Sequence, residues 1–250
     1  MQPCKLTGVI CIMKYPAAII SFMKISVLHG WDLTIAEARE LQTRLACRVI
    51  RSKAGIRPQA IGGIDVSVSR FSRLGRAAVV VLDYSSMELV DMATAEAEID
   101  FPYIPGLLSF REAPLVIKAF NKLNRRPDMI MVDGQGIAHP RRLGIASHLG
   151  LLLDITSIGC AKSRLIGTHD PLPPEKGAYV PLIDGDEMIG AAVRTKLAVN
   201  PLYISIGHRI DLDDSISYVL HCCRGFRLPE PTRMAHMAAG GTLKSNKLVS

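Results

Sequence analysis

One short segment carries the clearest chemical signal in the sequence. An apolar run, residues 129–132, ends in Asp133, and Gly134 and Gly136 follow it. A carboxylate at the end of a buried strand is costly unless it is paired or binds a cation, and the glycines let another backbone approach closely. Alternatively, Asp133 caps a helix that follows. The segment therefore predicts either a charged site or a helix cap.

Two further acidic residues have settings that could complete such a site. Asp65 lies in a strand-like segment, residues 60–69, on the same face as Gly63. The opposite face is apolar and would pack beneath helices, which leaves Asp65 facing a cleft. Glu112 follows Ser109 by three residues, which is the spacing of a capping box. A capping role and a catalytic role are both open for Glu112.

Carboxylates that converge from two strands and a helix N-terminus are what a magnesium site requires. Mg²⁺ takes oxygen ligands, keeps several waters and relies on few protein carboxylates together with substrate phosphate. Such an ion can activate water and neutralise the charge that builds up on a phosphodiester. Asp65, Glu112 and Asp133 are therefore candidate ligands for Mg²⁺.

Composition is that of a globular protein, and its charge suits a polyanionic partner, although basic proteins without such a partner are common. The 250 residues suit one domain, and the net charge of +7 with a pI near 9.2 suits a nucleic acid. Six cysteines form no CxxC pair, so we expect neither a zinc site nor a disulfide framework, and a cytoplasmic protein.

Both ends of the chain are expected to lie outside the folded domain, which we place at residues 29–240. Residues 1–28 are expected to be either a poorly ordered extension or the result of a translation start assigned too far upstream. Residues 241–250 are expected to form a flexible tail. The charge-free stretch 15–23 has only nine residues, whereas a membrane span needs about 20. We therefore expect no stable membrane association.

Hydrophobic spacing and turn residues predict the order of the elements. A helix capped by Asp32 or Thr34 precedes three strands joined by short turns, which is typical of an antiparallel meander. Strands then alternate with helices, so we expect an α/β protein with a central mixed β-sheet flanked by helices, in an RNase H-like layout. The expected strands are 60–69, 77–83, 89–99, 129–132, 155–158, 178–183, 188–193 and 202–206, and the later helices are 109–123, 144–153, 213–223 and 231–237.

A series of short segments gives the chain a family resemblance. The segments are Gly63–Ser67, Phe101–Leu108, Ser109–Glu112, Asp133–Gly136, His139–Arg141, Gly144–His148, Ala161–Leu165 and Arg227–Arg233. In composition and order they closely resemble endonuclease V, the repair nuclease for deaminated bases, over about residues 28–238. The resemblance implies an RNase H-like fold, a requirement for Mg²⁺ or Mn²⁺, and cleavage of the second phosphodiester 3′ to a deoxyinosine, leaving 3′-hydroxyl and 5′-phosphate ends.

The resemblance also assigns roles to particular residues. The family's acidic residues fall on Asp65, Glu112 and Asp133, and a further active-site position falls on His236, which by itself would be read as a partly buried helix histidine. Lys162 is similar to the family's lysine near the scissile phosphate, although a solvated basic residue is its plain alternative. Phosphate contacts are expected for Arg141, Arg142 and Arg164.

Two neighbouring features are expected to recognise the base. Pro102, Tyr103, Ile104 and Pro105 form a stiff segment with a planar ring, which can fill the gap left by a flipped base; an ordinary proline-bounded loop is the alternative. Backbone N–H groups would then reach the O6 acceptor that distinguishes hypoxanthine from adenine. The base-pocket positions fall on Gly106, Leu108, Gly134, Gly136, Ile145 and Leu165.

Three alternatives stay open on sequence alone. The substrate can be single- or double-stranded DNA containing deoxyinosine, or inosine in RNA, which a 2′-hydroxyl contact would distinguish. A protein that binds deaminated bases without cleaving them is a second hypothesis, against which the three acidic residues argue. Attachment to a membrane through residues 1–28 is a third. We expect a monomer.

Overall fold

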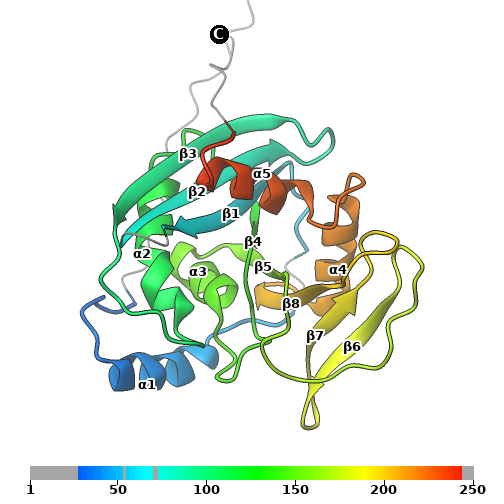
Figure 1. Cartoon of the computed structure of the whole chain (residues 1–250), viewed down its shortest axis with the longest axis horizontal. Helices are drawn as coiled ribbons and strands as arrows, with labels where there is room; N and C mark the ends of the chain where they lie inside the picture. The colour runs from blue at the N-terminus through cyan, green and yellow to red at the C-terminus, as the bar shows by residue number, and fades with distance from the viewer. Residues whose placement is uncertain (1–27, 53–54, 70–72, 244–250) are drawn as a thin grey trace, which may run out of the picture.

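The protein forms one mixed eight-stranded sheet with helices on both faces (Figure 1). The computed structural model describes residues 28–52, 55–69 and 73–243, so the predicted N-terminal extension and most of the predicted tail lie outside the described residues. The sheet order is β3-β2-β1-β4-β5-β8-β7-β6. The strands are β1 (Ala60–Val68), β2 (Leu74–Asp83), β3 (Leu89–Glu98), β4 (Met129–Val132), β5 (Thr156–Ala161), β6 (Tyr179–Asp184), β7 (Glu187–Val193) and β8 (Leu202–His208).

Parallel pairing at the centre of the sheet is what positions the site. β1, β4 and β5 run parallel to one another, whereas the outer strands pair antiparallel. The predicted meander of β1, β2 and β3 is confirmed, as is the mixed α/β class. The helices are α1 (Ile35–Ala46), α2 (Leu108–Phe120), α3 (Ile145–Leu153), α4 (Leu212–His221) and α5 (Glu230–Ala239).

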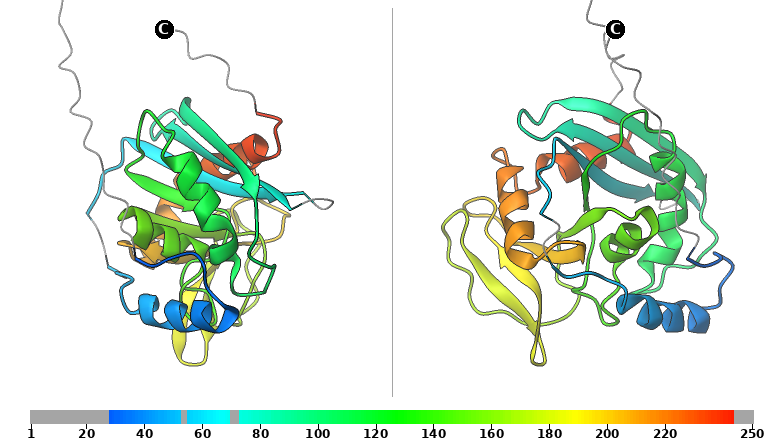
Figure 2. Two further views of the ribbon diagram at one scale, coloured as in Figure 1. Left: turned by 90° about the vertical axis from the view of Figure 1, so that its left-hand side faces the viewer. Right: turned by 180° about the vertical axis from the view of Figure 1, so that it is seen from behind.

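Two apolar cores lie on the two faces of the sheet. On one face Ile64 packs with residues of α2 and α3, as its place on the apolar face of β1 predicts. On the other face α5 packs on β1 and β2, and α4 packs on β8. Figure 2 shows α2 and α5 on opposite sides of the sheet. The sheet is therefore covered on both faces over β1 and β2.

The structure decides which of the candidate capping residues act as helix caps. Thr34, one of the two predicted caps, caps α1, and it also forms a capping box with Glu37. Ser109, however, lies inside α2, whose N-cap is Leu107, so the structure excludes the capping role that was open for Glu112. Asp133 caps no helix either, because α3 begins at Ile145 with Gly144 as its N-cap. Neither Glu112 nor Asp133 therefore acts as a helix cap.

Gly63 is required by the close approach of α5 to the sheet. A Cβ atom at this position would lie 1.9 Å from the carbonyl oxygen of Pro231, in the first turn of α5. Gly63 and Asp65 share a face of β1, so the same contact brings α5 beside Asp65. α5 therefore covers part of the face that the sequence predicted to line a cleft.

We predict that Gly63→Ala destabilises the protein by about 2–4 kcal/mol, because the added methyl group must push α5 away from β1. Urea unfolding measures the change. The matched control is Gly30→Ala, since a Cβ at Gly30 has no neighbour within 4 Å; it should change stability by less than about 0.5 kcal/mol. Equal effects of the two substitutions would contradict this packing argument.

Candidate active site

Charged side chains meet where β4 and β5 end beside β1. β1 and β4 pair in parallel with Ile64 opposite Val132, so Asp65 and Asp133 are the next residues on each strand. The amide of Asp133 donates a 3.0 Å hydrogen bond to the carbonyl of Ile64. Lys162 follows directly after β5, the next parallel strand. Its Nζ forms an ion pair with Oδ2 of Asp133.

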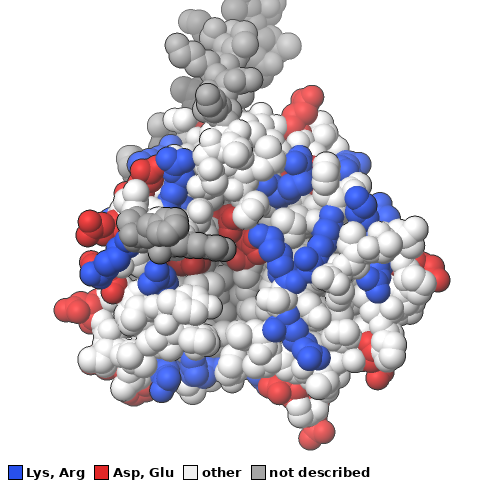
Figure 3. All heavy atoms as spheres, in the orientation of Figure 1, with Lys and Arg blue, Asp and Glu red and all other residues white. Residues whose placement is uncertain are grey.

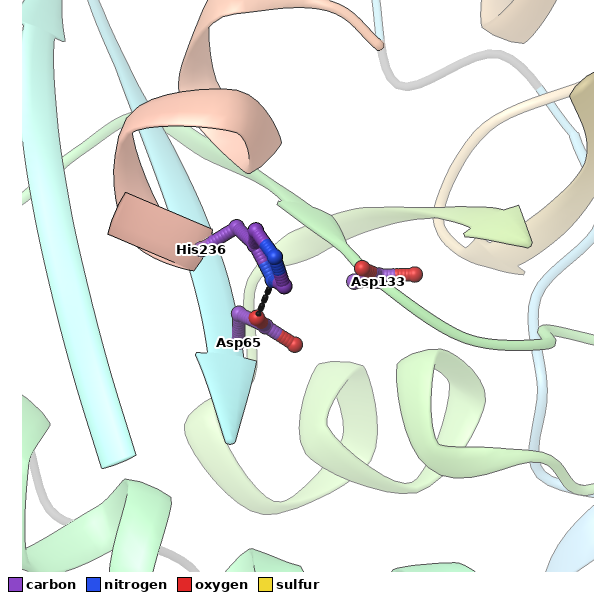
Figure 4. A group of neighbouring side chains, drawn as sticks. All are labelled: Asp65, Asp133 and His236. Atoms are coloured by element: carbon purple, nitrogen blue, oxygen red, sulfur yellow. Dashed lines mark hydrogen bonds and ion pairs between the residues drawn. The ribbon is translucent and has the colours of Figure 1, made fainter. Parts of the chain in front are cut away.

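His236 reaches the same place from α5. Its Nδ1 lies 2.7 Å from Oδ2 of Asp65, and because a carboxylate only accepts, Nδ1 carries the hydrogen. Ligand atoms of Asp65, Asp133 and His236 all lie within 4.8 Å of one another (Figure 4). The His236 side chain is 61% exposed, whereas those of Asp65 and Asp133 are each 11% exposed. The imidazole is therefore a surface group directed at the cluster, not a core histidine.

The cluster concentrates negative charge where water is largely excluded. Burial raises the pKa of the Asp65 carboxyl, and the charge of Asp133 raises it further, while His236 and Lys162 act in the opposite direction. Burial, followed by the charge of Asp65, raises the pKa of Glu112 to about 8. Glu112, on α2, is thus close enough to feel the cluster and is protonated near neutral pH.

This donor set fits a divalent cation. Two carboxylates and an imidazole within 4.8 Å offer the oxygen and nitrogen donors that such ions bind. The raised pKa of Asp65 also means that Lys162 and His236, which both act to lower it, do not offset the effects of burial and of Asp133. A bound cation would offset them. Glu112 is outside the group of three, so its direct ligation remains a prediction.

A cavity of about 350 Å³ adjoins the cluster, within the usual size range of ligand pockets. Asp133 of the acidic cluster and Lys162, its ion-pair partner, both line this cavity. The predicted positions that line it are Tyr103, Ile104, Pro105, Gly106, Leu108, Gly134, Ile145, Arg164 and Leu165.

The predicted wedge lies at this cavity. Tyr103 lines it and is 71% exposed; Pro102 is exposed as well but is not among the lining residues. The end of the segment is held by Gly106, which has a φ of +79°, a value that glycine adopts readily. Its carbonyl accepts hydrogen bonds from Gln42, His139 and Arg141. The ring of Tyr103 thus projects from an anchored loop.

Gly136 has a different role from the one predicted. Its amide donates a 2.8 Å hydrogen bond to Oγ of Ser205, and a Cβ there would lie 2.0 Å from the carbonyl oxygen of Ile206. Gly136 is buried against β8 and is absent from the cavity wall. The prediction that it lines the base pocket is therefore wrong: its lack of a side chain lets the loop pack on the sheet.

The three predicted phosphate-binding arginines are not equivalent. Arg142 forms ion pairs with Asp184 and Glu187. Arg141 donates to Gly106 and to Oε1 of Gln42. Both guanidinium groups are thus engaged within the protein, whereas Arg164 is exposed at the cavity. Arg164 is the best placed of the three to contact a phosphate.

The surface around the site has charges of both signs. Figure 3 shows acidic side chains near the middle of this face and Lys and Arg side chains gathered beside them. Such a distribution suits a cation at the acidic centre and a polyanion across the flanks. Among the described residues, no helix combines the length and apolar character needed to span a membrane.

Sequence reasoning missed several residues around the cavity. Gln42, buried in α1, donates to the carbonyls of Gly106 and Leu143. His148 is fully buried in α3 and bonds to Ser109 in the cavity wall. No local signal marks Gln42, since its partners are remote in sequence. His148 belongs to a family-like segment but had no assigned role.

Known proteins match both the sequence and the fold. A family model for endonuclease V matches residues 30–237. Endonuclease V of Dehalococcoides mccartyi is 53% identical over 217 residues, covering 87% of this chain and 97% of that protein. The crystal structure of endonuclease V from Streptomyces avermitilis has a TM-score of 0.81 at 40% identity, covering 85% of this chain and 94% of that one.

A further solved structure contains nucleic acid. Endonuclease V from Ciona intestinalis, in complex with a 24mer DNA containing an inosine followed by a ribo-adenosine, has a TM-score of 0.73 at 30% identity. The match covers 83% of this chain and 96% of that one.

The mixed sheet, with an acidic cluster at the ends of its central parallel strands, defines an RNase H-like protein. Within that class the matches are specific. The chain belongs to the endonuclease V family, and it is accordingly a nuclease.

We predict that Glu112→Gln stabilises the metal-free protein at high pH. Because the folded state raises the pKa of Glu112 from 4.5 to about 8, the wild type loses stability progressively between these pH values, and a glutamine does not. The melting temperatures in EDTA should be similar near pH 4.5, and the variant's advantage should grow up to about pH 8. Exposed Glu40→Gln is the control. A constant difference across the pH range would contradict the raised pKa.

Proposed function

We propose that the protein is a DNA repair endonuclease that recognises hypoxanthine in DNA. It hydrolyses the second phosphodiester 3′ to the lesion and leaves 3′-hydroxyl and 5′-phosphate ends, as its family resemblance implies. The DNA of the Ciona intestinalis complex, which contains an inosine, supports this substrate class. The protein acts as a cytoplasmic monomer on single- or double-stranded DNA.

The proposal rests on one observation: the cavity and the charged site have residues in common. Asp133 and Lys162 line the cavity and also take part in the charged site. Gly134, next to Asp133, contributes backbone to the cavity wall. A base seated in the cavity would therefore bring its own strand to the cluster, which is the proximity that hydrolysis of a nearby phosphodiester requires.

Each charged side chain has a task in this reaction. His236 fixes the orientation of Asp65 through its Nδ1–H. Lys162 Nζ, now paired with Asp133, can turn to a phosphate oxygen and offset its charge. Glu112 is protonated near neutral pH, and once it loses that proton it completes the acidic cluster, directly or through water. Arg164 contacts a backbone phosphate.

A divalent cation would bind between the two aspartates of the cluster. Asp65 and Asp133 would hold Mg²⁺, for which Mn²⁺ can substitute, and the bound ion supplies activation of water and neutralisation of the scissile phosphate. Glu112 and His236 support the same site from α2 and α5.

Lesion recognition combines the exposed ring with the cavity. Tyr103 can occupy the space that a flipped base leaves in the stack, which offsets an unstacking cost of a few kcal/mol. Backbone N–H groups at Gly106 and Gly134 would donate to O6 of hypoxanthine. Adenine carries an amine at that position, so its N–H donors would face the backbone N–H donors. The buried donors would then lack an acceptor, which disfavours binding of adenine.

The primary test is Asp133→Asn, which removes the charge and keeps the shape of the side chain. Nicking of a deoxyinosine-containing oligonucleotide in Mg²⁺ should fall by at least about 10³-fold, while binding of the same oligonucleotide in Ca²⁺ is retained. Exposed Asp213→Asn, in α4, is the control and should be fully active. An active Asp133→Asn enzyme would exclude the proposed role, and a wild type that binds without nicking would favour the binding-only hypothesis.

A second prediction concerns the wedge. Tyr103→Ala should reduce the ratio of inosine to adenine cleavage by about 10-fold or more, since stacking on an aromatic ring contributes about 1–3 kcal/mol. Its melting temperature should not change, because the ring is 71% exposed. Tyr179→Ala, at another exposed tyrosine, is the matched control. Unchanged selectivity with unchanged stability would refute the wedge.

An RNA substrate is a second candidate, favoured by the ribo-adenosine that follows the inosine in the Ciona intestinalis complex. Cleavage rates on DNA, on RNA and on a strand with one ribonucleotide after the inosine distinguish the two. Faster cleavage of the all-DNA strand is the expected result, and a strict requirement for the 2′-hydroxyl would reassign the protein to RNA.

A further inference from the structure

A chain of hydrogen bonds runs from the cavity wall to the start of the described chain. Oγ of Ser109, in the wall, lies 2.5 Å from Nδ1 of His148. Nε2 of His148 lies 2.8 Å from Nε2 of His29, and Nδ1 of His29 lies 2.6 Å from the carbonyl oxygen of Gly30. These contacts link α2, α3 and the segment before α1 in one unbroken series.

The end of the series fixes the direction of every hydrogen bond in it. The carbonyl of Gly30 can only accept, so Nδ1 of His29 carries a hydrogen. In a neutral imidazole the other nitrogen is then an acceptor, and Nε2 of His148 must donate to it. Nδ1 of His148 is left as an acceptor, so the hydroxyl of Ser109 donates to it. The Ser109 hydrogen therefore points toward His148.

The surroundings of His148 disfavour its charged form and hold its ring in place. His148 is fully buried, and burial lowers its pKa to about 3. Its ring packs against those of His29, Trp31 and Phe110 at centroid distances of 5.0–5.9 Å. Ser109 is itself buried, and among the described residues His148 is the one partner of its hydroxyl. Oγ therefore retains lone pairs with no partner among the described residues.

We propose that Ser109 is a specificity-determining residue, whose Oγ accepts a hydrogen bond from N1–H of the base in the cavity, and that His148 and His29 hold it in this acceptor state. The proposal rests on the proposed function. Hypoxanthine has a hydrogen on N1, whereas N1 of adenine is an unprotonated acceptor. Adenine would therefore place a lone pair against the lone pairs of Ser109, and neither group would be satisfied.

This role is distinct from recognition of O6 by backbone N–H groups. O6 separates hypoxanthine from adenine through the exocyclic group, and Ser109 separates them through the ring nitrogen. Guanine also has a hydrogen on N1, so Ser109 does not exclude guanine. The carbonyl of Gly106, another acceptor in the wall, already receives three hydrogen bonds from within the protein. Ser109 is therefore the better placed acceptor for N1–H.

The first test measures the tautomers and does not depend on activity. The ¹⁵N shifts and ring couplings of the full-length protein, recorded at about pH 8, where histidines are ordinarily neutral, report which nitrogen of each ring is protonated. We expect hydrogen on Nδ1 of His29 and on Nε2 of His148. Hydrogen on Nδ1 of His148 would make Ser109 an acceptor from the protein and overturn the proposal.

The second test combines a change of the Ser109 side chain with a change of the base and compares their effects on kcat/KM. Ser109→Ala should lower kcat/KM for deoxyinosine by about 10- to 100-fold, since an unpaired buried donor costs about 1–3 kcal/mol. For 2′-deoxynebularine, which has an unprotonated N1, the same substitution should leave kcat/KM unchanged or raise it. Equal losses on both bases would mean that Ser109 has only a structural role and would overturn the proposal.

Two variants at His29 keep the proposal testable if Ser109→Ala folds poorly. In His29→Gln the amide oxygen can still accept from Nε2 of His148, so selectivity for deoxyinosine over 2′-deoxynebularine should be retained. His29→Leu removes that acceptor, so the hydrogen of His148 can lie on either ring nitrogen. Selectivity should therefore fall several-fold. Identical selectivity in the two variants would contradict the role of the series. If the wild type nicks neither base, the proposed function fails, and the ¹⁵N measurement still decides the state of Ser109.

Discussion

The mutual repulsion of Asp65 and Asp133 is the constraint around which the structure is arranged. The two carboxylates follow paired positions on adjacent parallel strands, so the sheet itself keeps them together and neither can move away without breaking backbone hydrogen bonds. His236 and Lys162 approach them from α5 and from the end of β5. Burial and like charge nevertheless raise the pKa values of Asp65 and Glu112. The metal-free fold therefore holds an electrostatic cost that a divalent cation would relieve.

The loop after β4 joins this charged centre to the cavity. Asp133 belongs to the cluster, Gly134 contributes to the cavity wall, and Gly136 packs the loop onto β8. Because these positions are adjacent in the chain, a displacement of one is transmitted to the others. The same loop thus sets the position of a cation ligand relative to the space for a base. Such a short connection favours a fixed distance between the recognised nucleotide and the cleaved bond.

The fold and the centre of the site were accessible from the sequence, whereas the supporting contacts were not. Alternating apolar residues predict the strand around Asp65, an unbroken apolar run predicts the strand before Asp133, and parallel order brings the two carboxylates together. The role of Gly136 was misread, because its close contact with β8 joins segments remote in sequence. Local spacing left Ser109 open as the partner of Glu112 in a capping box, whereas its partner is His148 in another helix. Gln42 and His148 act through long-range contacts, which no local pattern encodes.

Calorimetry of Mg²⁺ binding at pH 7, in two buffers with different ionisation enthalpies, tests the central claim most directly. If the cluster is strained by its own charge and Glu112 is protonated, Mg²⁺ binding should release roughly one proton, and the Glu112→Gln protein should bind without that release. Failure to bind Mg²⁺ at millimolar concentration, or binding with the same heat in both buffers, would contradict the account.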